Sequence, residues 1–297
     1  MSKEGKNKHK ALRIICIILV SLILLSSAEL LYSNFALTVS RYEIRDQRTS
    51  NRIRIAFISD LHSREFGKDN ARLLRKIAGE EPDLIAFAGD IINSDADEEE
   101  VERMLSLISA ASGIAPVYFG LGNHENDYLS THGDSLLSDL SKAGAVVLDR
   151  RYLDISVNGT PIRIGGYSGY YRTPQMSTSD PDKQADDFRF FDDFENTDRF
   201  KVLICHIPLN WLDWDYRNRS PVDLVLSGHY HGGVIRIPII DKGLFAPYVG
   251  KYPPYTKGFF VGKKANVVLT TGLAGSKGIP RVFNPPEIVV VNIEPET

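Results

Sequence analysis

Gly122-Asn123-His124-Glu125 follows the apolar run Pro116-Val117-Tyr118-Phe119 and a glycine-rich turn, so a carboxamide and an imidazole stand side by side at the end of a predicted strand. Open α/β sheets bind their ligands at the carboxyl ends of their strands. An Asn oxygen is a hard metal ligand, and an imidazole can bind a metal ion or carry a proton. Alone, such a tetrapeptide more often forms a turn with a solvated His. The interpretation therefore depends on the residues at the ends of the other predicted strands.

Polar residues of the same kind follow four more apolar runs, at residues 52–59, 82–88, 200–205 and 222–227. The first run is followed by Asp60-Leu61-His62 and the second by Gly89-Asp90, although either Asp could merely cap a helix. The later runs lead into His206 and into Gly228-His229-Tyr230-His231-Gly232-Gly233, whose glycines permit sharp turns. Five of the seven histidines thus lie just beyond predicted strands, which random placement would not often produce.

The order of the predicted elements indicates an α/β fold. Helices are expected over residues 71–80, 99–111 and 136–143, and their alternation with the first strands implies parallel strands joined by right-handed crossovers. A hairpin turn is expected at Asn158-Gly159. The acidic residues 95–100 are interpreted as the favourable first turn of a helix rather than as a cation site. Residues 167–200, with one helix expected around 183–193, are interpreted as a surface connection, with a lid as the alternative.

The residues at the strand ends form one set of metal-ligand types: two carboxylates, one amide oxygen and up to five imidazoles. They are Asp60, His62, Asp90, Asn123, His124, His206, His229 and His231. Hard oxygen combined with imidazole suits Mn, Fe or Zn better than Mg or Ca. The set exceeds the four to six ligands that one ion usually takes, so two ions bridged by a carboxylate are expected. Such a pair can hold phosphate oxygens and stabilise an in-line displacement.

The amino-terminal segment is predicted to meet a membrane. Five cations and a single acid in residues 3–13 precede the apolar run 14–28. A helix over Ala11–Tyr32 would be about 33 Å long, enough to cross a bilayer, and the preceding cations favour a cytoplasmic amino terminus. Ser26-Ser27-Ala28 also resembles a signal-peptide cleavage site, but the apolar stretch exceeds a usual signal core. The predicted organisation is a basic tail (1–10), an anchor or signal (11–32), a linker with an edge strand (33–51) and one domain (52–297).

Composition excludes several other classes of protein. Net charge is −3 with no basic excess, so no nucleic-acid-binding patch is expected. The two cysteines, Cys16 and Cys205, form no disulfide framework and no thiolate zinc site. The aromatic segment 247–255 is interpreted as a loop that packs its own Tyr rings, with a wall beside the membrane as the alternative. No protein partner is implied.

The five blocks, Asp60-Leu61-His62, Gly89-Asp90, Gly122-Asn123-His124-Glu125, His206 and Gly228-His229-Tyr230-His231, resemble those of the calcineurin-like metallophosphoesterases. The resemblance runs from about residue 52 to residue 293. The segments 40–44 and 280–290 are similar to the membrane-anchored bacterial phosphodiesterase branch, which includes relatives of the UDP-2,3-diacylglucosamine hydrolases. The implied fold is an α/β four-layer sandwich, two mixed β-sheets flanked by helices, with an N-terminal transmembrane helix.

The resemblance also implies a role for each residue. Asp60, His62, Asp90 and His231 would hold the first metal ion, and Asp90, Asn123, His206 and His229 the second, with Asp90 as the bridge. A hydroxide between the metals would attack phosphorus in line, His124 would act as general acid, and Glu125 would orient a neighbour. Val234 stands where relatives of this branch often carry Gln, which affects the expected substrate and not metal binding.

The sequence therefore predicts a membrane-anchored, dinuclear metal-dependent hydrolase of phosphodiesters or pyrophosphates. Mn is the first expectation for the metal, with Fe or Zn as alternatives, and the substrate class remains open among lipid, envelope polymer and nucleotide. The catalytic domain is expected outside the cytoplasm, or secreted if the signal is cleaved. The alternative is a catalytically silent metal-binding membrane scaffold, which would bind metal without cleaving an activated phosphodiester.

Overall fold

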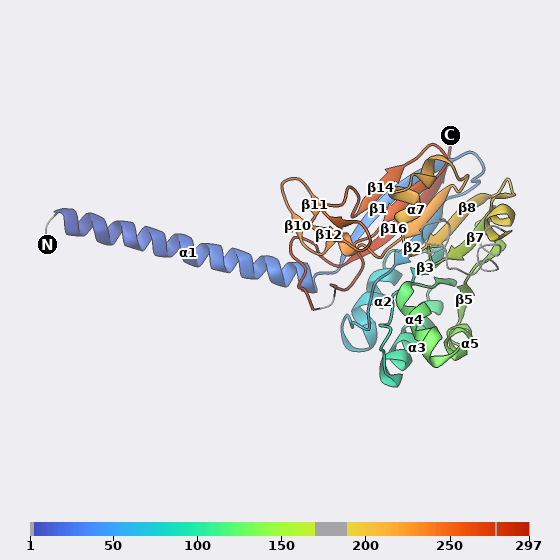
Figure 1. The fold of residues 1–297 in the computed structure, drawn as a ribbon, viewed down its shortest axis with the longest axis horizontal. Coiled ribbons are helices and arrows are strands. Elements are labelled where there is room, and N and C mark those ends of the chain that lie inside the picture. Colours follow the sequence, from blue (N-terminus) through green and yellow to red (C-terminus); the bar gives the residue numbers. More distant parts are fainter. Residues whose placement is uncertain (1–2, 170–188, 277, 297) are drawn as a thin grey trace.

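A long helix projects from a domain built on two β-sheets (Figure 1). The structure is a computed structural model that describes residues 3–169, 189–276 and 278–296. The helix, α1, covers Lys3–Phe35, and only residues 36 and 37 separate it from the first strand. It begins before the predicted Ala11 and includes most of the basic tail. Residues 9–35 form the one candidate membrane span among the described residues, by length and composition.

The first sheet contains the strands that end in the first three blocks. Its order is β1-β16-β2-β3-β4-β5, with β2 to β5 parallel, β16 antiparallel to β2, and β1 parallel to β16. The bounds are β1 (Thr38–Asp46), β16 (Glu287–Pro295), β2 (Ile53–Ile58), β3 (Leu84–Ala88), β4 (Val117–Gly120) and β5 (Ala145–Leu148). The predicted edge strand is confirmed as β1. The carboxyl-terminal strand β16 lies between β1 and β2, so the first and last strands of the domain are neighbours in one sheet.

Helices cover the outer face of this sheet: α2 (Ala71–Ala78), α3 (Glu98–Ser112), α4 (Asn123–His132) and α5 (Ser135–Lys142). The acidic start of α3 has the structural role that was predicted for it. Asp97 accepts from the Glu100 amide and Glu100 from the Asp97 amide, a reciprocal cap of the helix start. The helix α4 was not predicted, and His132, expected in a loop, is its last residue. Helix α4 begins directly after β4 and thus carries Asn123 and His124 in its first turn.

The second sheet contains the strands that end in the last two blocks. Its order is β14-β15-β9-β8-β7-β6, with β15, β9, β8 and β7 parallel. The bounds are β14 (Gly258–Val261), β15 (Asn266–Leu269), β9 (Leu224–Ser227), β8 (Phe200–Cys205), β7 (Thr160–Tyr167) and β6 (Arg151–Val157). The predicted hairpin at Asn158-Gly159 joins β6 to β7. Residues 189–195 are helical, and the rest of the helix predicted around 183–193 lies outside the described residues.

The two sheets pack face to face, and the predicted four-layer sandwich is confirmed. Phe57, Leu84, Val202 and Leu226 belong to the buried layer between the sheets. A second core lies between the first sheet and helices α2, α3 and α5, and a third covers the outer face of the second sheet around Trp211 in α7 (Leu209–Leu212). Central strands such as β3 and β8 are buried along their whole length, which explains their continuous apolar sequence.

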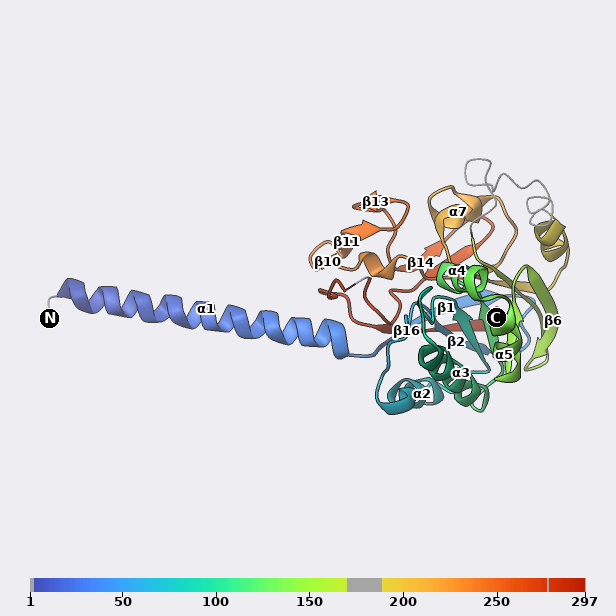
Figure 2. The same cartoon turned by 60° about the horizontal axis from the view of Figure 1, so that its bottom comes forward.

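Two small hairpins leave the second sheet after β9. They consist of β10 (Arg236–Ile237) with β11 (Lys242–Gly243), and β12 (Phe245–Ala246) with β13 (Gly250–Lys251). Both lie on the side of the domain from which α1 projects, as the two views show (Figures 1 and 2).

Candidate metal centre

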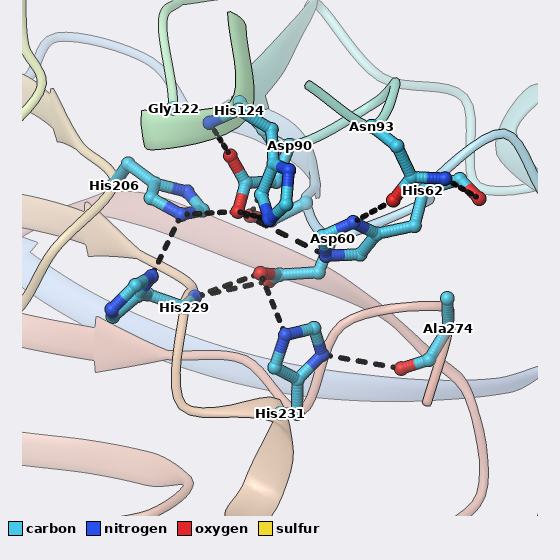
Figure 3. A network of polar contacts seen from close by, with 12 residues as sticks. Asp60, His62, Asp90, Asn93, Gly122, His124, His206, His229, His231 and Ala274 are labelled. Atoms are coloured by element: carbon cyan, nitrogen blue, oxygen red, sulfur yellow. Dashed lines mark hydrogen bonds and ion pairs between the residues drawn. The ribbon is translucent and has the colours of Figure 1, made fainter. Parts of the chain in front are cut away.

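The carboxyl ends of strands from both sheets converge on one cluster of polar side chains (Figure 3). Asp60 and Asp90 come from the first sheet, and His206 and His229 come from the second. The His229 amide donates to both carboxylate oxygens of Asp60, at 2.9 and 3.1 Å, which ties the two sheets together. The structure therefore brings side chains from all five blocks together, as predicted.

The backbone at this cluster is strained. Five predicted ligands have a positive φ, an uncommon conformation for residues with a side chain: Asp60, His62, Asp90, His229 and His231. Such strain concentrates at functional sites, where surrounding structure enforces it. Gly122 allows the close approach, because a Cβ there would lie 2.2 Å from Asp90 Oδ1. Gly228 does the same beside Asp60, where a Cβ would lie 2.4 Å from Oδ2.

Two groups of ligand atoms meet at Asp90. In one, the potential ligand atoms of Asp60, His62 and His231 lie within 4.8 Å of one another. The other contains Asp90, His206 and His229 within the same limit, and a third group, His62, Asp90 and His124, links the two. His206 Nε2 is 3.0 Å from Asp90 Oδ2, and His62 Nε2 is 3.8 Å from the same oxygen. One carboxylate oxygen thus faces both groups.

Outward-facing hydrogen bonds set the tautomers of three histidines. His206 Nδ1 is 2.6 Å from the Ala88 carbonyl and His231 Nδ1 is 3.3 Å from the Ala274 carbonyl. Because a carbonyl only accepts, each Nδ1 carries a proton and Nε2 faces inward. His62 Nδ1 bonds Asn93 Oδ1 at 2.9 Å in the same way. Metal-binding histidines are oriented by such bonds.

The side chains fit a metal ion. Asn123 Oδ1, His62 Nε2 and His229 Nε2 are buried without a hydrogen-bond partner among the described residues. A buried polar atom left unpaired costs about 1–3 kcal/mol, which a bound cation would offset. His229 Nδ1 and His206 Nε2 also converge to 3.2 Å beside Asp90.

The charges of the cluster are strongly coupled. Burial by itself would raise the pKa of Asp90, but the nearby imidazoles of His206, His62 and His124 hold that pKa below its usual range. Burial would likewise lower the pKa of His206, yet Asp90 outweighs burial and raises the pKa to about 9. The pKa of His229 is lowered by burial and by His206, and burial lowers that of His231 to about 4. The last two are therefore neutral and ready to bind metal at neutral pH.

Comparison with known proteins agrees with this geometry. A sequence profile described as calcineurin-like phosphoesterase matches residues 53–233. The chain belongs to this family. It is 27% identical over 307 residues to an uncharacterised metallophosphoesterase of Campylobacter jejuni, covering 99% of this chain and 74% of that one. It is 28% identical over 249 residues to the metallophosphoesterase YkuE of Bacillus subtilis, covering 81% of this chain and 79% of YkuE. It is 24% identical over 247 residues to the phosphodiesterase YaeI of Escherichia coli, covering 81% of this chain and 82% of YaeI. The protein is a metal-dependent phosphoesterase.

Metal binding to this phosphoesterase is expected to release at least about one proton at pH 7.5, because His206 must lose its proton before Nε2 can bind an ion. The apparent affinity should therefore rise with pH up to about 9, the pKa of His206 in the metal-free protein. Titration calorimetry with Mn²⁺ in two buffers of different ionisation enthalpy counts the protons. The proton released by His206 should no longer be detected at a pH above the pKa of His206. Equal heats in both buffers at pH 7.5 would show that metal binding releases no proton and would contradict the protonated state of His206.

Glu125 holds the backbone of the phosphoesterase centre. It is fully buried in the first turn of α4 and accepts from the amides of Asp90 and Ile91 at 2.7 Å and of Gly122 at 2.8 Å. Burial and the neighbouring Asp90 raise the pKa of Glu125. The residue was expected to orient a neighbour, and its oxygens accept hydrogen bonds from the amides of the loop that carries Asp90.

Glu125→Gln is expected to lower kcat/KM about 10- to 100-fold, as for other residues that orient metal ligands. The new NH₂ group would face amide donors, and the lost charge-assisted bonds should reduce the free energy of unfolding by about 1.5–3 kcal/mol. Steady-state kinetics and urea unfolding measure the two effects. Glu102→Gln, an exposed position on α3, is the matched control. Unchanged kinetics in Glu125→Gln would show that the loop holds its shape without these bonds.

His124 lies at the edge of the cluster. Its ring is 4.8 Å from that of His62, and its Nε2 is 4.0 Å from Asp90 Oδ2. Its Nδ1 accepts a hydrogen bond from the Ser94 amide at 3.0 Å, so the proton of the neutral ring is on Nε2. The His124 amide donates to Asp90 Oδ1 at 2.8 Å, which leaves Oδ2 facing His206 and His62. His124 therefore presents a donor, Nε2–H, at the centre.

Three further residues at the centre were missed. Asn93 orients His62, and the Tyr248 ring stacks on His229 at 5.3 Å between centroids. Arg281 is fully buried and donates to the Ala274 and Thr271 carbonyls. Its carbonyl partners lie near its own position in sequence, yet no local motif marks the contact. In the sequence, only the polar residues 93–95 shortly after Asp90 could have indicated a role for Asn93.

Proposed function

We propose that this phosphoesterase hydrolyses phosphodiester or pyrophosphate bonds at a dinuclear centre bridged by Asp90. The observation that carries the proposal is the position of Asp90 Oδ2, which faces His206 Nε2 at 3.0 Å and His62 Nε2 at 3.8 Å. A single-ion site needs no carboxylate shared between two groups of histidines. The name of the E. coli relative, a phosphodiesterase, favours diesters over monoesters.

The proposed ligands of the first ion are Asp60, His62, Asp90 and His231, and those of the second are Asp90, Asn123, His206 and His229. Two such ions would neutralise charge on a phosphoryl group and lower the pKa of water. The mixture of imidazole, carboxylate and amide oxygen suits Mn, with Fe or Zn as alternatives. Outer partners such as the Ala88 carbonyl and Asn93 would keep the imidazoles in the required tautomer.

His124 is the proposed catalytic acid. The oxygen of a water molecule bonds to phosphorus in line with the leaving oxygen and loses a proton to solvent. The bond from phosphorus to the leaving oxygen breaks, and the leaving oxygen takes the proton of His124 Nε2, which solvent later replaces. Full transfer requires a doubly protonated ring, which must give up the Ser94 hydrogen bond to Nδ1. With that bond intact, Nε2–H stabilises charge on the leaving oxygen as a hydrogen-bond donor.

The test uses the full chain in detergent, stripped of metal and then supplied with Mn²⁺. Bis-p-nitrophenyl phosphate and p-nitrophenyl phosphate are assayed side by side. Mn²⁺-dependent cleavage of the diester in preference to the monoester is the expected result. Metal binding without cleavage of either ester would refute the proposed activity and favour a metal-binding membrane scaffold. Cleavage of the monoester alone would reassign the substrate class.

We also propose that α1 is an uncleaved anchor, with the catalytic domain on the extracytoplasmic side. The support is an apolar helix of 27 residues preceded by cations. The full-length chain is expected to stay in the membrane fraction through high-salt and alkaline washes and to be released by detergent. Its intact mass should include residues 1–28. A soluble chain shortened after Ala28 would show that the segment is a cleaved signal.

A further inference from the structure

The last turns of α1 are bonded to a loop that supports the metal centre. Ser33, fully buried, accepts from the Asn284 amide at 3.0 Å. Asn34 exchanges two hydrogen bonds with the backbone of Arg281, at 2.9 and 3.1 Å. Asn284 in turn donates from Nδ2 to the His231 carbonyl at 2.7 Å. These contacts fix the direction of α1 relative to the metal centre. The short link of two residues between α1 and β1 restricts it further.

The same loop lies level with the end of the apolar part of α1. The Phe283 amide donates to Glu29 Oε1, and Glu29 follows directly after the apolar run that ends at Ala28. Any part of the domain that reaches as far along the helix as Phe283 would meet the surface of a membrane that α1 crosses. The Phe283 side chain itself is 47% exposed.

Exposed apolar side chains gather at this level. Ten large ones in the described part of the chain lie outside α1, and seven of these come from the loop 279–283 and the two hairpins of residues 236–252. We call six of them the apolar collar: Ile239, Ile240, Phe245, Tyr252, Ile279 and Phe283. Both hairpins lie on the side from which α1 projects (Figures 1 and 2). Ile239, at the tip of the first, is 94% exposed.

We propose that the apolar collar inserts into the surface of the lipid bilayer that α1 crosses, so that the metal centre opens at the membrane surface. A gathered apolar surface marks an interaction site, and aromatic side chains favour the membrane–water boundary. Continuity with α1 identifies the occupant as lipid, because the helix carries the collar to that boundary. The exposed Lys242 and Lys251 on the same hairpins suit anionic headgroups.

The collar is directly connected to the metal centre. Arg236, at the start of the first hairpin, donates to the Gly232 carbonyl at 2.8 Å, next to His231. Tyr248, between the strands of the second hairpin, stacks on His229. A headgroup at the membrane surface would therefore reach the ligands while its acyl chains stay in the bilayer. This consequence rests on the proposed function and assigns the substrate as a lipid-linked phosphoester.

Depth in the membrane tests the collar without any assay of activity. In the full chain with Cys16→Ser, Cys205 is buried, so a nitroxide can be attached at Ile239→Cys or, as the matched control, at Val261→Cys, which is 70% exposed. In vesicles of phosphatidylethanolamine and phosphatidylglycerol, the ratio of oxygen to nickel-chelate collisions should be several times higher at position 239. Equal ratios would overturn the proposal. Protection from both reagents would also overturn it, in favour of a protein contact.

Matched esters test the consequence for the substrate. Ile239→Ser combined with Ile240→Ser should slow cleavage of hexadecyl p-nitrophenyl phosphate in vesicles about tenfold and leave methyl p-nitrophenyl phosphate in water unchanged. Val261→Ser should change neither rate. Equal rates for the double variant and the native chain on the hexadecyl ester would refute the lipid-linked assignment. If the native chain cleaves neither ester, the proposed function fails, and the depth measurement still decides the collar.

Discussion

Asp90→Ala is expected to reduce kcat/KM for bis-p-nitrophenyl phosphate by at least about 1,000-fold, since one carboxylate would be lost from both proposed ion sites at once. The second ion should be lost, and metal analysis of the purified variant should show fewer than two ions per chain. In the metal-free protein the variant also removes the carboxylate that raises the pKa of His206, so burial should leave that imidazole neutral at neutral pH.

The size of this loss requires a matched control for folding. Asp134→Ala removes an exposed carboxylate that makes no capping hydrogen bond, and it should leave both rate and metal content unchanged. Asp90→Asn keeps the shape of the side chain without its charge and should lose nearly as much activity as alanine. If Asp90→Ala kept its activity and two ions per chain, Asp90 would not be the bridging ligand.

His124→Asn is expected to lower kcat by about 100- to 10,000-fold on esters with poor leaving groups. The loss should be smaller with p-nitrophenol, because that leaving group departs with little need of a proton. Metal content should not change, since His124 is proposed as an acid and not as a ligand. The dependence of kcat on leaving-group basicity measures the effect and should be steeper in the variant.

His132 supplies the control for this experiment. It stands in the last turn of the same helix, is exposed, and packs on Tyr128 at 4.1 Å between ring centroids. His132→Asn should leave the leaving-group dependence as it is in the native chain. A loss of metal in His124→Asn would instead place His124 among the ligands, which its Nε2, at 4.0 Å from Asp90 Oδ2, is near enough to join.

The sequence alone was sufficient to predict which side chains meet in this cluster. Each of these residues follows an apolar run closely, as Asp60 follows 52–59 and His206 follows 200–205. One short stretch of sequence therefore predicts both a strand and the polar side chain at its end. Parallel strands then bring their carboxyl ends to the same edge of a sheet. The same local logic predicted the acidic cap of α3 and the apolar helix α1. It did not predict α4, because Asn-His after a strand is compatible with either a turn or a helix start.

Only the tertiary structure decided how those ligands are held. Asn93 lies 31 residues from His62, and the Ala88 carbonyl lies 118 residues from His206, yet these contacts set which nitrogen faces inward. The attachment of α1 to residues 281–284 spans about the whole chain, as in the 247 residues between Asn34 and Arg281. No periodicity encodes such pairs, because they form where packed layers bring distant loops together. The chemical composition of the site is therefore local in the sequence, whereas its tautomers and its position relative to α1 arise from packing.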